Sequence, residues 1–112
     1  QLLGDSFTFD FSAIPQNHFD TAFIDGSHHR AVVRADHSTG LQLLNGSGIL
    51  IWHDFSLASE VVRAHPSCHG VIAAVADDIA TLTERFDLYW LKDTFILIGV
   101  PKVASTAISA PN

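Results

Sequence analysis

Two short apolar runs, each followed by acidic and histidine side chains, constrain most strongly what this chain can fold into. Residues 21–24 are typical of a buried strand, and residues 25–28, Asp-Gly-Ser-His, follow it directly. A second run, residues 48–52, is followed in the same manner by His53 and Asp54. Parallel strands place their carboxyl ends at one rim of a sheet, where α/β proteins bind ligands. The sequence therefore predicts two carboxylates and two imidazoles on one rim.

The segment between the two runs indicates that they are parallel. From His28 to Leu44 apolar side chains recur at helical spacing, and residues 45–48, Asn-Gly-Ser-Gly, are typical of a helix stop and a turn. The order strand, helix, strand is typical of a right-handed crossover between parallel strands. The consecutive apolar residues 49–51 predict that the second strand is covered on both faces.

The remainder of the chain is expected to add a helix and an antiparallel hairpin. Residues 55–70 form a long connection of the kind that often serves as a lid. Residues 70–82 have the pattern of one amphipathic helix, with Asp77 and Asp78 on its outer side. Two β-rich runs, residues 86–91 and 94–100, are expected to pair around a tight turn at Lys92-Asp93.

Composition excludes some classes of function. The chain has 112 residues, of which 47% are hydrophobic and 16% charged, as in one globular domain. Six basic against twelve acidic side chains give a formal charge of -6, which disfavours nucleic acid and favours cationic ligands or metal ions. No apolar stretch reaches the length of a membrane span, and no signal peptide pattern is present, so we expect no membrane partner and a cytoplasmic location. A single cysteine, Cys68, agrees with a reducing compartment.

Individual residues leave alternatives open. Asp25 after a strand is also typical of a cap on the following helix, and Asp5 of a simple turn residue. A histidine at a helix start, such as His28, is typically an exposed or capping side chain. His53 has the position of a side chain that packs in the core or lies beside a metal ligand. A third hypothesis is a hydrolase that uses Asp25 and His28. It is disfavoured because the residues around Ser27 do not form a nucleophile-elbow motif.

The chain resembles the carboxyl-terminal half of class I S-adenosylmethionine-dependent methyltransferases in the following motifs, taken in order: Gly4-Asp5-Ser6, residues 19–28, the helix with Asp36, residues 44–54, Gly70-Val71 with Ala74-Val75, and the hairpin. It is most similar to the small-molecule O-methyltransferase branch, in which the fourth strand ends in Ile-Asp-Gly-X-His. The resemblance implies an α/β fold, a fragment of a Rossmann-like three-layer sandwich with parallel strands followed by an antiparallel hairpin. It implies a partial methyltransferase-like domain over residues 1–100. The small and polar residues that follow predict a flexible tail over residues 101–112.

The resemblance also implies roles for five residues. Asp5, with Ser6 beside it, matches the position that contacts the adenine of the cofactor. Asp25 matches the position that faces the methyl donor and that ligates a divalent ion in metal-dependent members, and Asp54 matches a second ligand. His28 matches a general base proposed in sugar-modifying members. The implied reaction is methyl transfer from S-adenosylmethionine to a hydroxyl of a small molecule, with Mg²⁺ in metal-dependent members.

The chain departs from the family at its amino-terminal side. The Gly-rich turn after strand one and the acidic residue that closes strand two have no counterpart, and Gly46-Ser47-Gly48 lies on the wrong side of the sheet. Residues 1–3 are typical of a strand end. We therefore expect the cofactor-binding half to be missing and the strand at residues 21–24 to be an open edge, which predicts either a homo-oligomer or a piece of a longer enzyme. The alternative to an enzyme is a non-enzymatic, self-associating half-domain or interaction module.

Overall fold

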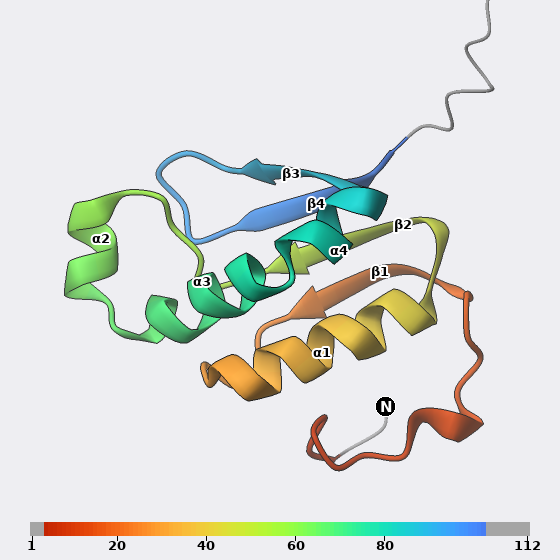
Figure 1. Ribbon diagram of the computed structural model, residues 1–112. Coiled ribbons are helices and arrows are strands. Elements are labelled where there is room, and N and C mark those ends of the chain that lie inside the picture. The colour runs from red at the N-terminus through yellow and green to blue at the C-terminus, as the bar shows by residue number, and fades with distance from the viewer. Residues whose placement is uncertain (1–3, 103–112) are drawn as a thin grey trace, which may run out of the picture.

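The computed structural model describes residues 4–102, which form a sheet with helices packed on one of its faces (Figure 1). The strands are β1 (Phe19–Ile24), β2 (Leu44–Trp52), β3 (Phe86–Trp90) and β4 (Leu97–Pro101). The helices are the 3-10 helix η1 (Phe11–Ala13), α1 (Arg30–Leu43), α2 (Ser59–Ala64), α3 (Ser67–Asp77) and α4 (Ile79–Arg85). Residues 1–3 and 103–112, for which a strand end and a tail are predicted, lie outside this description.

The strand order is β1-β2-β4-β3. β1 and β2 are parallel, and both β4 against β2 and β3 against β4 are antiparallel. This confirms the predicted fold class, a mixed α/β arrangement compatible with a Rossmann-like fragment, in which parallel strands are followed by an antiparallel hairpin. Within residues 4–102, β1 is an edge strand, as predicted.

The sheet has one buried face and one open face among the described residues. Leu50 and Trp52 of β2 are fully buried beneath the helices, whereas Ile49 is 37% exposed. The expectation that residues 49–51 are covered on both faces is therefore wrong: a continuous apolar run cannot reveal how many layers cover a strand. Phe23 of β1 is 55% exposed and Tyr89 of β3 is 54% exposed, both on the open face.

The turn predicted at residues 45–48 is instead part of β2, which begins at Leu44. Leu44 pairs with Phe19 of β1, and the Asn45 amide donates a hydrogen bond to Asp20 across the two strands. A Cβ on Gly48 would lie 2.8 Å from the Leu44 side chain, so glycine serves here for close packing and not for a turn. α1 accordingly spans Arg30–Leu43, shorter than predicted at its start.

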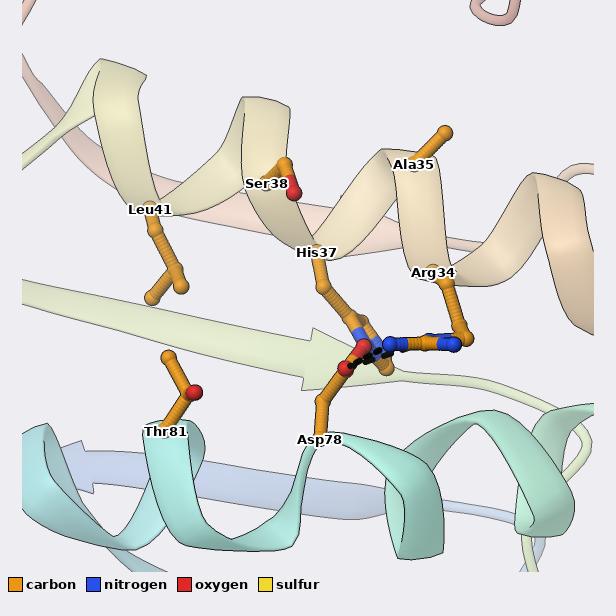
Figure 2. Close-up of a pocket in the computed structure, with 7 residues that line it drawn as sticks. All are labelled: Arg34, Ala35, His37, Ser38, Leu41, Asp78 and Thr81. Carbon is orange, nitrogen blue, oxygen red and sulfur yellow. Dashed lines mark hydrogen bonds and ion pairs between the residues drawn. The ribbon is translucent and has the colours of Figure 1, made fainter.

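The helix predicted over residues 70–82 is two helices, α3 and α4, which meet at Asp78. Asp77 is exposed, as predicted, whereas Asp78 is half-buried, and both carboxylates face α1. Asp77 pairs with Arg30 of α1, and Asp78 pairs with Arg34 of the same helix, as Figure 2 shows for the second pair. The hydrogen bond from Arg30 lowers the pKa of Asp77. The helical period shows which face of a helix is polar, but it does not show whether another helix packs a polar face against it.

The hairpin is antiparallel, as predicted, but its turn is not tight. Six residues, 91–96, connect β3 to β4, and the Leu91 N–H donates to the Ile96 carbonyl at 3.0 Å. Asp93 within this loop has φ 63°, in the left-handed region that aspartate tolerates better than most residues. Pro101, expected to follow the hairpin, pairs with Phe86 as the last residue of β4. None of the described helices combines the length and the apolar character needed to cross a membrane.

Arg85 at the end of α4 ties the carboxyl end of α1 to the start of β2. Its guanidinium donates to the carbonyl oxygens of Leu41, Leu44 and Asn45 at 2.7, 3.0 and 2.9 Å. Because these part-buried carbonyls would lose a charged donor, we expect Arg85→Ala to lower the free energy of unfolding by about 2 kcal/mol. Urea unfolding followed by circular dichroism measures this. Arg63→Ala, at an exposed position of α2, is the control, and equal losses in the two variants would contradict the assignment.

Candidate functional site

The carboxyl ends of β1 and β2 lie side by side. Ile24 and Trp52 form the last residue pair of the parallel ladder, and Asp25 and His53 follow them directly. The His53 N–H donates to the Ile24 carbonyl at 3.1 Å and so extends the pairing by one bond. The predicted meeting of the two strand ends on one rim is therefore confirmed.

Asp54 lies at the centre of this rim. Its Oδ2 is 2.8 Å from Nε2 of His28, and its Oδ1 is 3.2 Å from Nδ1 of His53. The carboxylate is 16% exposed. The backbone of Asp54 has φ 61°, a conformation that few residues other than glycine adopt and one that is found preferentially at functional sites. One oxygen of Asp54 is thus held by a hydrogen bond to His28, and the other lies close to the imidazole of His53 from a different loop.

Asp25 faces the same imidazole from the other strand. Its Oδ1 is 3.4 Å from His53 Nδ1. The alternative that Asp25 caps the following helix is wrong, because α1 begins at Arg30 with His29 at the N-cap position. The His29 N–H is instead satisfied by the hydroxyl oxygen of Ser27 at 3.0 Å. The carboxylate of Asp25 is therefore available to the rim.

Asp25, His53 and Asp54 form a donor set that fits a divalent cation. Each offers one ligand atom, and these atoms all lie within 4.8 Å of one another. His53 Nδ1 is buried and has no hydrogen-bond partner among the described residues, although two carboxylate oxygens lie nearby. Buried polar atoms without a partner are uncommon, and a bound ion would explain this one. Carboxylates suit Mg²⁺, and the imidazole extends the set towards Mn²⁺ or Zn²⁺.

The sequence did not predict His53 as a metal ligand, because its position favoured a packing residue or one that lies beside a ligand. The signal that could have identified it is its place directly after β2, beside Asp54. Its ring does also pack, with the ring of Phe95 at a centroid distance of 6.1 Å. The imidazole therefore joins the rim to the loop between β3 and β4.

Phe95 also lines a pocket of about 320 Å³. Three of its lining side chains are aromatic, Phe95, Trp90 and His65, and the rings of His65 and Phe95 meet edge to face at 5.2 Å. Ser56, which is 2% exposed, also lines it. The pocket thus combines apolar and aromatic walls with polar groups from Ser56, His65, Asp93 and Thr94, as small-molecule sites do.

His28 joins the rim through Asp54, although 26 residues separate the two in the chain. Its side chain is 50% exposed, so it stands where the rim meets solvent. The backbone carbonyl of His28 is approached closely by Gly70 of α3. Three predicted site residues, Asp25, His28 and Asp54, are therefore brought together by the fold.

Of the two residues expected to contact the adenine, only Ser6 lines a pocket together with a rim residue. The Asp5 carboxylate accepts a hydrogen bond from the Phe7 N–H at 2.9 Å, which is the turn alternative left open by the sequence. Ser6 lines a pocket of about 350 Å³, shared with Asp25 and Gly26, between β1 and α1. Ser6 therefore shares a pocket with the rim residue Asp25, whereas Asp5 is not among the residues that line it.

The segment that builds this site has a counterpart among known families. Residues 1–55 match the model of the family described as "Methyltransferase domain". No curated protein matches the chain. The matched residues include β1, α1, β2 and all the rim residues from Asp25 to Asp54. Residues 1–55 are thus similar to a methyltransferase domain, which supports a methyltransferase-like function.

Proposed function

We propose that this chain contributes to methyl transfer from S-adenosylmethionine to a hydroxyl group of a small molecule, assisted by a divalent cation. The observation that carries the proposal is the convergence of Asp25, His53 and Asp54 within the segment similar to a methyltransferase domain. The net charge of -6 supports it further, because an acidic protein attracts both a metal ion and a cationic sulfonium.

In this proposal the carboxylates of Asp25 and Asp54 and Nδ1 of His53 would hold the cation. A cation at such a site lowers the pKa of a hydroxyl that binds to it. His28 then accepts the hydroxyl proton. Its Nε2 faces Asp54 Oδ2, so a neutral ring that donates from Nε2 keeps Nδ1 as the basic nitrogen. Asp54 thereby orients the base.

The two pockets beside the rim suggest where the small molecules bind. Ser6 and Asp25 line the pocket between β1 and α1, and the resemblance assigns the cofactor to these residues together with Asp5. We assign the methyl acceptor to the aromatic pocket formed by Trp90, Phe95 and His65. Such a surface favours a molecule with a flat apolar part that carries its hydroxyl group towards the rim.

A second candidate function is self-association without catalysis, favoured by the edge of β1 that residues 4–102 leave open and by one apolar row on the open face. This row crosses all the strands through Phe23, Ile51, Ile98 and Tyr89, which are register partners. Exposed apolar surface beside an unpaired strand edge favours contact with another chain. The partner in this alternative is a second copy of this chain.

One experiment separates the two candidates. The molar mass of the purified chain is first measured by light scattering after gel filtration, which gives its oligomeric state. The chain is then titrated calorimetrically with S-adenosylhomocysteine, with and without Mg²⁺. Saturable binding in the micromolar range supports the methyltransferase, and a greater heat with Mg²⁺ supports the cation. A folded oligomer that gives no heat at millimolar ligand would sink the enzymatic proposal and support self-association. A folded monomer that gives no heat contradicts both.

A further inference from the structure

A buried histidine, His37 of α1, lies behind the rim. His37 is 2% exposed, and Trp52, the last residue of β2, is fully buried. The indole Nε1–H of Trp52 donates to His37 Nε2 at 2.7 Å, and His37 Nδ1 lies 2.8 Å from Asp78 Oδ2, as Figure 2 shows for the second contact. An indole can only donate, so Nε2 is the acceptor and Nδ1 carries the proton that is donated to Asp78. The contacts thus select one neutral tautomer.

Charged groups from two helices surround this histidine. Arg34 of α1 donates to Asp78 Oδ1, and both side chains point into a pocket of about 300 Å³ between α1 and the junction of α3 and α4 (Figure 2). Asp36 on α1 and Asp77 at the end of α3 complete the charged surroundings. Burial lowers the pKa of His37, against the opposing effect of Asp78. Burial acts to raise the pKa of Asp78, but the hydrogen bonds from Arg34 and His37 outweigh it and the pKa is lowered.

This polar arrangement is not what stability alone would select. Replacing both partners of a buried hydrogen bond by apolar groups of similar shape often costs little, whereas a satisfied polar contact fixes orientation. The orientation fixed here is that of Trp52, which is paired with Ile24 on β1 and with Leu97 on β4. Directly after Trp52 the chain turns through His53 and the left-handed backbone of Asp54.

We propose that His37 is a positioning residue: by holding the indole of Trp52, it fixes the turn that presents His53 and Asp54 at the rim. The inference rests on the proposed function in so far as these two residues bind a cation. Neither His37 nor Asp78 is part of the donor set, so their effect on the rim passes through the end of β2.

Two variants separate positioning from simple packing. His37→Phe keeps a ring but removes both hydrogen bonds, whereas His37→Gln retains an acceptor for Trp52 and a donor for Asp78. We expect His37→Phe to shift the indole N–H resonance of Trp52 and to change the backbone HN–Hα coupling of Asp54, which reports its φ angle. We also expect it to weaken Mn²⁺ binding about 10-fold, as is typical when a residue behind a metal ligand is removed. His37→Gln should retain the Asp54 coupling and bind Mn²⁺ within about 3-fold of the parent.

The control is Ser38→Ala, which changes an exposed neighbour that lines the same pocket. The inference is overturned if His37→Phe leaves the Asp54 coupling unchanged, or if His37→Gln alters it as strongly as His37→Phe. Because the coupling is measured without metal, it tests positioning even if the parent chain binds no Mn²⁺, an outcome that would contradict only the proposed cation site.

The pH dependence of stability gives a readout specific to the imidazole. The folded pKa of His37 lies below its unfolded value of about 6.5, so its neutral form contributes stability above that pH. This contribution is lost as the pH falls from about 6.5 through the folded pKa, because the unfolded chain then binds a proton that the folded chain does not. Urea unfolding at pH 7.5 and 5.5 should show a smaller loss in His37→Gln than in the parent. Equal losses would contradict a neutral His37.

Discussion

Gly70→Ala is expected to destabilise this protein by about 3 kcal/mol, the upper end of what overpacking usually costs. A Cβ at this position of α3 would lie 1.9 Å from the carbonyl oxygen of His28 and 3.1 Å from the backbone nitrogen of Arg30. Both are backbone atoms, which cannot move aside as the end of a flexible side chain can. Alanine would gain about 1 kcal/mol of helix propensity at an interior helix position, which is too little to offset the clash.

Chemical unfolding in urea, followed by far-ultraviolet circular dichroism, measures the effect. Gly26→Ala is the matched control, because a Cβ at Gly26 meets nothing within 4 Å and this glycine also lies beside the rim. We expect its free energy of unfolding to change by less than about 1 kcal/mol. If Gly70→Ala were as stable as this control, the close approach of α3 to the start of α1 would be refuted.

The clash at Gly70 should also disturb the candidate site. The contact at Gly70 holds the segment that carries His28, whose imidazole lies 2.8 Å from Asp54. A chain that accommodates alanine by moving this segment therefore loses the hydrogen bond that orients Asp54. Any folded fraction of Gly70→Ala is expected to bind a divalent cation more weakly than Gly26→Ala does.

Asp54→Asn is expected to weaken binding of a divalent cation by about 100-fold or more, since even residues behind a metal ligand contribute 10- to 100-fold. The substitution removes the charge that the cation requires and keeps the shape of the side chain. Asparagine also tolerates the left-handed backbone found at Asp54, φ 61°, so the turn should persist. The effect should therefore appear in binding and not as unfolding.

Mn²⁺ is a suitable probe, because electron paramagnetic resonance counts the free ion during a titration. The chain offers a matched control in Asp93→Asn, which makes the same substitution at another left-handed aspartate, φ 63°, in the loop between β3 and β4. This control should bind Mn²⁺ as the parent does. Unchanged affinity in Asp54→Asn would exclude the rim as the cation site.

The juxtaposition at the rim was predictable from sequence because it follows from topology. Two apolar runs joined by one helix are typically parallel neighbours, and their carboxyl ends then meet. Asp25 and Asp54 could therefore be placed together without knowledge of any contact between them. The fold class followed from the same order of elements and from the β-rich runs near the end of the chain.

Other features were beyond the reach of the sequence because they depend on how elements pack. The pattern predicted Asp77 and Asp78 on the outer side of a helix, where Asp77 does remain exposed, but it did not predict that α1 presents Arg30, Arg34 and His37 to them. Nothing local to residues 77 and 78 indicates that partners come from more than 40 positions earlier in the chain. The same holds for the open face of the sheet, which a continuous apolar run does not reveal.

By itself the sequence determined the order β1, α1, β2, the closing antiparallel hairpin and the rim at which Asp25, His53 and Asp54 gather, because strand and helix periods and the crossover rule act locally. The tertiary structure alone decided that His53 turns its Nδ1 between two carboxylates, and that His28 reaches Asp54. It also decided that His37 holds Trp52 behind them. These contacts join side chains that meet only when distant segments pack, so their geometry is a property of the packed core and not of any one stretch of chain.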